Sequence, residues 1–157
     1  MEQEKLGQAI WDMRVNMLRL AMSITGNSHD AEDAVSTAML KACQRADTLK
    51  EPEKLRPWLL TITARCCYDL LRKRRREYPV AEVQAPQPPV LIGAETVYET
   101  LLELPPPLAQ VLTLYYYEGF ATKEIAEVLH VSRPTVSMRL IRGRKMLAEL
   151  LKGGNDA

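Results

Sequence analysis

The feature that most constrains the fold is a pair of helices joined by a tight turn, which begins with residues 121–145, ATKEIAEVLHVSRPTVSMRLIRGRK. The second helix is predicted to end near residue 152. Thr122 is the predicted N-cap of the first helix and Ser132 that of the second, because a hydroxyl oxygen there accepts a bond from a free backbone N–H. Pro134 lies in the first turn of the second helix, where a missing N–H does little harm. The apolar residues that repeat at helical spacing are Ile125, Ala126, Leu129, Val136, Leu140, Leu147 and Leu151.

Most of the second helix carries charge of one sign. Residues 128–148 contain five basic residues and no acidic one, whereas a solvated helix face usually mixes both signs. A short helix, a tight turn and a basic second helix are typical of a helix-turn-helix that docks in the DNA major groove. An ordinary helical hairpin with a solvated basic face is the alternative. The side chains expected to face DNA are Arg133, Thr135, Ser137, Met138, Arg139 and Arg142.

Helical periodicity also dominates the first half of the chain. One long amphipathic helix is predicted over residues 6–24, with Gly26 at its end. A second helix begins at Asn27 or Ser28, and its alanines predict close packing against neighbouring helices. A third helix is predicted over residues 56–76. It ends in five consecutive cations, RKRRR, a density that indicates a nucleic-acid patch or a nuclear-import tag.

Four prolines between residues 78 and 93 interrupt the helical pattern and predict an extended linker. Its apolar residues leave open whether it lies in a groove or packs back on a domain. Short helices follow, and one has a predicted apolar face of Leu108, Val111, Leu112 and Tyr115. With no strand pattern, the predicted fold is all-α: a domain over residues 1–77, the linker 78–93, a second domain over 94–152 and a tail over 153–157.

The charge balance and the cysteines limit the classes of partner and compartment. The net charge is only +1; residues 1–77 hold 14 basic and 11 acidic residues, and residues 78–157 hold 7 and 9, so local patches select the partner. Three cysteines, two of them adjacent, fit neither a disulfide framework nor a CxxC metal site, and indicate reduced thiols in the cytosol. The polar start and the lack of a long apolar run predict neither signal peptide nor membrane anchor.

The sequence contains none of the common catalytic motifs, such as a phosphate-binding loop, HExxH or GxSxG. The two histidines, His29 and His130, are about 100 residues apart, without the spacing of metal ligands. We therefore expect no enzymatic activity, no cofactor, no metal site and no small-molecule substrate.

Three segments, in this order and spacing, resemble the extracytoplasmic-function (ECF) sigma factors of bacterial RNA polymerase. They are DAEDAVSTAMLKA at residues 30–42, WLLTITARCCYDLLRKRRR at 58–76 and EIAEVLHVSRPTVSMRLIRGRKML at 124–147. The resemblance covers nearly the whole chain. It implies a sigma-2 domain, a bundle of three to four helices, joined by the proline-rich linker to a sigma-4 helix-turn-helix domain.

The resemblance also implies partners and roles for particular residues. The partners would be core RNA polymerase (its β′ and β subunits), promoter DNA and an anti-sigma factor that is either soluble or membrane-bound. The residues 132–145 would read the −35 element through the side chains given above. The −10 element would be bound by Trp58, Arg65, Arg72, Lys73 and Arg76. Core polymerase would be bound by Asp30, Glu32, Asp33, Ser36 and Lys41.

Departures from the family pattern fall mainly on the faces expected to bind these partners. These departures are expected to affect the promoter sequence that is recognised and the affinity for core polymerase, and to leave the fold unchanged. They are Ser36, Met39, Arg65, His130, Pro134 and Met138. Two alternatives to a promoter-recognition factor follow. One is a helix-turn-helix regulator that uses the C-terminal hairpin alone; the other is a sigma-like interaction protein that titrates an anti-sigma factor.

Overall fold

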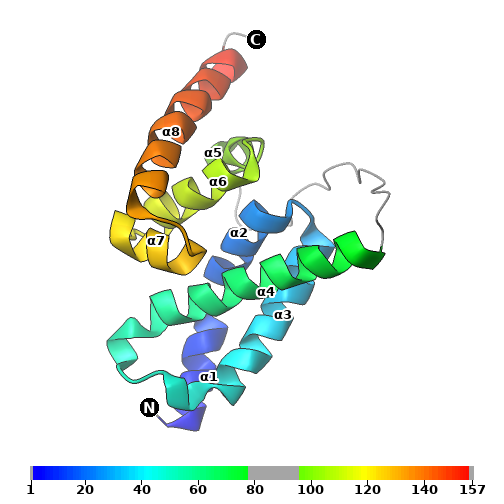
Figure 1. The fold of residues 1–157 in the computed structure, drawn as a ribbon, viewed down its shortest axis with the longest axis vertical. Helices are drawn as coiled ribbons and strands as arrows, with labels where there is room; N and C mark the ends of the chain where they lie inside the picture. Colours follow the sequence, from blue (N-terminus) through cyan, green and yellow to red (C-terminus); the bar gives the residue numbers. More distant parts are fainter. Residues whose placement is uncertain (1, 78–95, 156–157) are drawn as a thin grey trace.

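The computed structural model describes residues 2–77 and 96–155, and every regular element in these ranges is helical, which confirms the all-α prediction (Figure 1). The first range contains α1 (Gln3–Asp12), α2 (Arg14–Thr25), α3 (Ser28–Gln44), η1 (Ala46–Thr48), η2 (Pro52–Lys54) and α4 (Leu55–Glu77). The second contains α5 (Thr96–Leu101), α6 (Pro106–Leu112), η3 (Thr113–Tyr117), α7 (Thr122–Leu129) and α8 (Arg133–Asn155). The predicted linker, residues 78–93, lies outside the described residues.

The single N-terminal helix predicted over residues 6–24 is wrong, because the structure has two helices that meet at Met13. The Met13 N–H donates to the Ile10 carbonyl, three residues back, at 3.0 Å, and so ends α1. The apolar repeat continues through this break, and neither glycine nor proline marks it. The end of α2 is as predicted: Gly26 adopts φ 66°, in the left-handed region that glycine tolerates best.

The helices α2, α3 and α4 pack against one another in the first half of the chain. Asn27 caps α3, since its side-chain oxygen accepts the Asp30 N–H at 3.1 Å. Small side chains on α3 allow the close approach that the sequence predicts. The buried residues of α3 on this face are Ala31, Ala34, Val35, Ala38 and Ala42.

Two of the three cysteines lie inside this bundle. Burial raises the pKa of the Cys66 and Cys67 thiols, whereas Cys43 is exposed near the end of α3. Because the thiolate is the reactive form, we expect a thiol reagent at pH 8 to modify Cys43 rapidly and the other two only after unfolding. Counting modified thiols with and without urea checks this expectation, and rapid modification of all three in the native protein would contradict it.

The second half of the chain contains a local π-helix that changes which residues face the core. Pro106 begins α6, and Leu108, Val111 and Leu112 of the predicted apolar face are buried. The helix then widens to a π-helical segment, η3, and the altered turn rotates the side chains that follow. Leu114 is therefore fully buried, while Tyr115, predicted for the apolar face, is 38% exposed.

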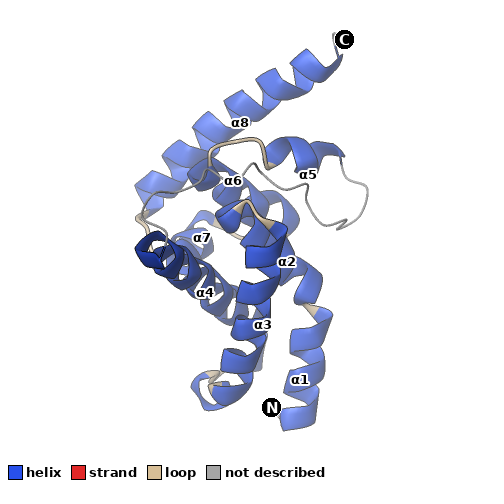
Figure 2. Cartoon of the chain, turned by 90° about the vertical axis from the view of Figure 1, so that its right-hand side faces the viewer, coloured by secondary structure: helices blue, strands red, loops and turns tan. Residues whose placement is uncertain are grey.

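The helices α7 and α8 form the predicted helix-turn-helix. Thr122 is not the N-cap of α7; that position is Ala121, whose N–H donates to Glu124 Oε1 at 2.9 Å. Ser132 does cap α8, since its Oγ accepts the Thr135 N–H at 3.3 Å. His130 occupies the turn at φ 58°. α8 continues to Asn155, past the end predicted near residue 152, and its C-terminal part extends away from the other helices (Figures 1 and 2).

Gly143 sets the distance between α8 and α6. A Cβ at this position would lie 3.0 Å from Leu112 Cδ1 and 3.1 Å from its Cγ, and Leu112 is fully buried. We expect Gly143→Val to reduce the free energy of unfolding by about 2 kcal/mol through overpacking, as measured by urea titration. Gly7→Val is the control, because no atom lies within 4 Å of a Cβ there, and its effect should stay below about 0.5 kcal/mol. Equal effects of the two variants would contradict the prediction.

The two halves of the chain pack against each other. α2 contacts α6 and η3, and α4 contacts α7. The buried apolar residues of both halves form one continuous cluster, from Leu6 in α1 to Leu140 in α8. We call this packing of the two halves the closed arrangement.

Candidate nucleic-acid interface

The N-terminal part of α8 presents most of the predicted DNA-facing side chains to solvent. Arg133, Ser137, Met138 and Arg142 are exposed, and Thr135 and Arg139 are half-buried. The hydroxyls of Ser132 and Thr135 lie 2.8 Å apart and share a hydrogen bond, so Thr135 helps to fix the first turn. Val136 and Leu140 are buried on the opposite face and hold the helix in place.

One exposed side chain of α8 was missed by the sequence reasoning. Ile141 is 67% exposed, which is the highest exposed fraction of any large hydrophobic residue in the described ranges. It stands between basic residues on the same helix, and apolar side chains at such positions can contact the methyl group of thymine. Its signal in the sequence was its offset from the apolar repeat of Val136, Leu140 and Leu147.

The second predicted set of cations lies along α4. Arg65, Arg72, Lys73 and Arg76 are exposed. Arg72 forms an ion pair with Asp69, and Lys73 Nζ lies 3.9 Å from Glu77 Oε1, both within the helix and open to solvent. Such exposed pairs contribute little to stability, so these cations can exchange their carboxylate for a phosphate.

The cation at the centre of the RKRRR run has a structural contact instead. Arg74 Nη2 lies 2.6 Å from Asp30 Oδ1, and Asp30 is buried at the start of α3. This ion pair ties the C-terminal part of α4 to α3. Asp30, predicted to bind core polymerase, is therefore placed where it stabilises the bundle, with only a small fraction of its surface open to a partner.

Trp58 lies at the other end of α4. Its indole N–H donates to Thr48 Oγ1 at 3.0 Å, and the ring is half-buried. It lines a cavity of about 390 Å³ together with Arg65, and the cationic side chains Arg45 and Lys54 lie on the same cavity. The arrangement offers an aromatic face beside positive charge, which suits an unstacked base and its phosphate.

The closed arrangement brings residues of the two predicted DNA-binding sets to one cleft. A cavity of about 890 Å³ between α4 and the α7–α8 turn is lined by Arg65, Arg72 and Arg75 from α4, and by His130 and Arg139 from the other half. Arg75 was not among the predicted site residues. The remaining predicted residues, including Arg133, Met138 and Arg142, do not line this cleft.

The predicted core-binding residues of α3 separate into two groups. Glu32, Asp33 and Ser36 are exposed, whereas Asp30 is buried and Lys41 is half-buried. Leu40, missed by the sequence reasoning, is 61% exposed and follows Glu32 and Ser36 at a spacing of four residues. α3 therefore presents a stripe of carboxylates followed by an exposed leucine.

Over residues 2–77 and 96–155, no three His, Cys, Asp or Glu side chains gather as a metal ion would require. None of the helices in these ranges has the length and apolarity needed to cross a membrane.

The chain matches two family models, one for each half. Sigma-70 region 2 matches residues 14–77, and Sigma-70, region 4 matches residues 94–147. The first contains the α4 cations, and the second contains the helix-turn-helix of α7 and α8. The two halves are thus of the classes that make up a sigma factor.

Individual relatives agree with these matches. RNA polymerase sigma factor SigV of Bacillus subtilis is 29% identical over 142 residues, covering 88% of this chain and 86% of SigV. ECF RNA polymerase sigma factor SigM of Mycobacterium tuberculosis is 30% identical over 141 residues, covering 85% of this chain and 70% of SigM. The solved structure of the sigma factor RpoE with the anti-sigma factor NepR from Bartonella quintana has a TM-score of 0.75 at 27% identity, covering 89% and 92% of the two chains.

The chain therefore belongs to the ECF sigma factors, which direct bacterial RNA polymerase to promoters. This confirms the resemblance found in the sequence.

Proposed function

We propose that α3 docks the chain on core RNA polymerase, and that α4 and α8 bind the −10 and −35 promoter elements. The observation that carries the proposal is the opposite charge of two exposed helix faces. α3 exposes Glu32 and Asp33, whereas residues 128–148, which include most of α8, contain five basic residues and no acidic one. An acidic face is repelled by DNA and suits a basic protein surface, and an unmixed basic face suits a polyanion.

The α3 stripe supplies the contact with core polymerase in this proposal. Glu32 and Asp33 offer exposed charge partners, and Leu40 adds an apolar anchor on the same side of the helix. Ser36 lies between them and is small enough to permit close approach. Asp30 contributes indirectly, because its ion pair with Arg74 fixes the start of α3.

The two DNA contacts differ in kind. On α8, Arg133, Arg139 and Arg142 project from a rigid helix, which suits reading of base edges and phosphates in the major groove. On α4, Trp58 and its neighbouring cations suit a base taken out of the stack and its backbone. The proposal assigns the double-stranded −35 element to α8 and the opened −10 element to α4.

Partners and setting follow from the same proposal. Because a relative of similar fold is described in complex with an anti-sigma factor, we propose that an anti-sigma factor, either soluble or membrane-bound, also binds this chain. The site of action is then the cytoplasm, where the polymerase works, and the chain contributes no catalytic chemistry of its own.

The test is transcription by sigma-free core polymerase. The purified chain is added to core on a library of genomic promoters, and the transcripts are sequenced. We expect defined start sites preceded by a shared pair of sequence elements, and co-elution of the chain with core. A variant with Glu32 and Asp33 replaced by alanine should lose co-elution while keeping its helix content, with Glu2→Ala plus Glu4→Ala as a control of equal charge.

The outcomes separate the alternatives. Core binding without defined start sites would support a sigma-like interaction protein. Duplex binding without co-elution would support a regulator that uses the helix-turn-helix alone. The absence of both core binding and defined start sites would overturn the proposal.

A further inference from the structure

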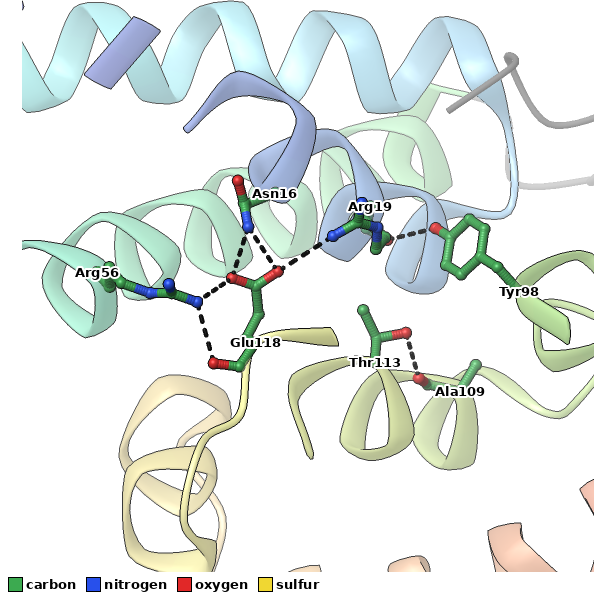
Figure 3. A network of polar contacts seen from close by, with 7 residues as sticks. All are labelled: Asn16, Arg19, Arg56, Tyr98, Ala109, Thr113 and Glu118. Carbon is green, nitrogen blue, oxygen red and sulfur yellow. Dashed lines mark hydrogen bonds and ion pairs between the residues drawn. The ribbon is translucent and has the colours of Figure 1, made fainter. Parts of the chain in front are cut away.

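Glu118 is a buried carboxylate whose partners all come from the other half of the chain. It lies between η3 and α7, and its side chain is fully buried. Asn16 Nδ2 donates to both of its carboxylate oxygens, at 2.9 and 3.0 Å (Figure 3). Arg56 Nη2 lies 2.8 Å from Oε1, and Arg19 Nη1 lies 3.6 Å from Oε2. Asn16 and Arg19 belong to α2, and Arg56 belongs to α4.

The arginines that pair with Glu118 make further contacts across the same boundary. Arg56 Nη2 also donates to the Glu118 backbone carbonyl at 3.0 Å. The Arg19 guanidinium lies 4.9 Å from the centre of the Tyr117 ring, and the Tyr98 hydroxyl donates to the Arg19 carbonyl at 2.7 Å (Figure 3 shows the latter). These contacts extend the network from α2 and α4 to η3 and α5.

This network depends on the closed arrangement. A carboxylate is strongly disfavoured in a protein interior unless charges and donors surround it. Within the described residues, the partners of the Glu118 carboxylate lie only on α2 and α4. If the halves separated, the carboxylate would lose all of them, and water would have to replace them. Arg19 is similarly dependent on the closed arrangement, because its side chain is only 15% exposed and its ion-pair partner Glu118 belongs to the other half.

The closed arrangement conflicts with simultaneous contact to two promoter elements. Arg65 and Arg72 of α4 line the same cavity as Arg139 of α8. Elements at −10 and −35 are separated by roughly 25 base pairs, which is about 85 Å of duplex at 3.4 Å per step. The whole of α4, with 23 residues, is only about 35 Å long. Both sets of cations can reach their elements only after the halves separate.

We propose that Glu118 is a latch that holds the isolated chain in the closed arrangement, and that the chain opens at this network when it binds core polymerase and promoter DNA. The function of the latch rests on the proposed function, because it concerns access of α4 and α8 to DNA. The latch itself is a property of the free chain and is measured without any partner.

The experiment measures the separation of the halves by single-molecule energy transfer between two dyes. Lys54 and Glu127 line one cavity from opposite halves, and Lys123 lies one turn before Glu127 on α7. Dyes are attached to Lys54→Cys and Lys123→Cys, both exposed positions, in a Cys43→Ser background. Transfer should be high in the otherwise unchanged chain. Glu118→Gln keeps one amide oxygen for Asn16 but removes the charge that pairs with Arg19 and Arg56, so the ratio of open to closed molecules should rise about tenfold.

A second variant and a control keep the test independent of folding. Arg19→Gln plus Arg56→Gln removes the same ion pairs from the other side of the boundary and should give a similar increase. Glu103→Gln changes one exposed carboxylate in the second half and should leave the ratio unchanged. Circular dichroism identifies a variant that has lost helices, and the other variant then decides. An unchanged ratio in folded variants would overturn the proposal.

A final arm of the experiment connects the latch to function. It distinguishes failure of the latch proposal from failure of the proposed function. Adding core polymerase and a promoter with both elements should lower energy transfer in the chain with Glu118 intact. If transcription starts while transfer stays high, the latch proposal is overturned and the proposed function stands. If no transcription starts but Glu118→Gln still opens the chain, the proposed function fails and the latch stands.

Discussion

Replacement of Arg139 and Arg142 by alanine is expected to weaken binding to duplex DNA carrying the −35 element by about 100-fold, while binding to core polymerase is unchanged. An arginine that reads a base edge contributes about 1–3 kcal/mol, so two together give roughly 2–6 kcal/mol. Arg142 is exposed on the outer face of α8, and Arg139 lies one turn before it at the edge of the cleft. Fluorescence anisotropy at a fixed salt concentration measures DNA binding, and co-elution measures core binding.

Arg144 offers a matched control on the same helix. Its Nε donates to the Tyr116 hydroxyl at 2.8 Å, and its guanidinium lies 4.9 Å from the centre of the Tyr115 ring. Because these contacts direct it towards η3, Arg144→Ala should reduce duplex affinity less than threefold. A loss of binding free energy for Arg144→Ala that is half the loss for the double variant would show that charge alone matters, since it removes one positive charge instead of two. Loss of both duplex and core binding would point to misfolding or to a wrong assignment of α8.

The helices of this fold were predictable because their signals are local. Apolar residues at helical spacing gave α3, α4, α7 and α8, and Gly26, Asn27 and Ser132 marked ends that the structure confirms. Each of these signals acts within a few residues, through a cap or through one face of a helix. The family resemblance added the order of the two domains, which periodicity alone does not determine.

The wrong predictions concern places where local pattern and packing disagree. The break at Met13 leaves the apolar repeat intact, so periodicity does not reveal it. The π-helix η3 shifts the side chains after it, which moves Tyr115 out of the core and Leu114 into it. Thr122 looked like a cap by residue type, whereas the backbone begins α7 one residue earlier and uses Glu124 instead.

The candidate site was predictable as a set of side chains and not as an arrangement. The cations of α4 and α8 were identified from charge patterning, and most of them are exposed. Their meeting at one cleft depends on contacts between residues far apart in the chain, such as Arg56 with Glu118. In the sequence, Glu118 resembles any acidic residue before a glycine, so its burial had no local signal. The same holds for Asp30, which read as a surface acid and instead pairs with Arg74.

Replacement of Arg72, Lys73 and Arg76 by alanine is expected to weaken binding to a single-stranded −10 oligonucleotide by at least tenfold at low salt. Each cation that neutralises a phosphate of a single strand contributes about 0.7 to the slope of log K against log salt, so the slope should fall by about 2. Removal of Arg72 and Lys73 also frees Asp69 and Glu77, whose charges then repel the strand. Binding is measured across a salt series, with the slope as the main result.

A control with the same change in net charge distinguishes local contacts from bulk attraction. Lys5, Lys50 and Lys152 are exposed and lie outside the α4 face, and their triple replacement by alanine removes three positive charges as well. Each variant loses three positive charges from a chain whose net charge is +1, so both become equally negative overall. If the slope depends on the cations of α4, it falls only in the first variant. Equal slopes in the two variants would contradict a phosphate-binding role for these three residues and would leave long-range attraction as the cause.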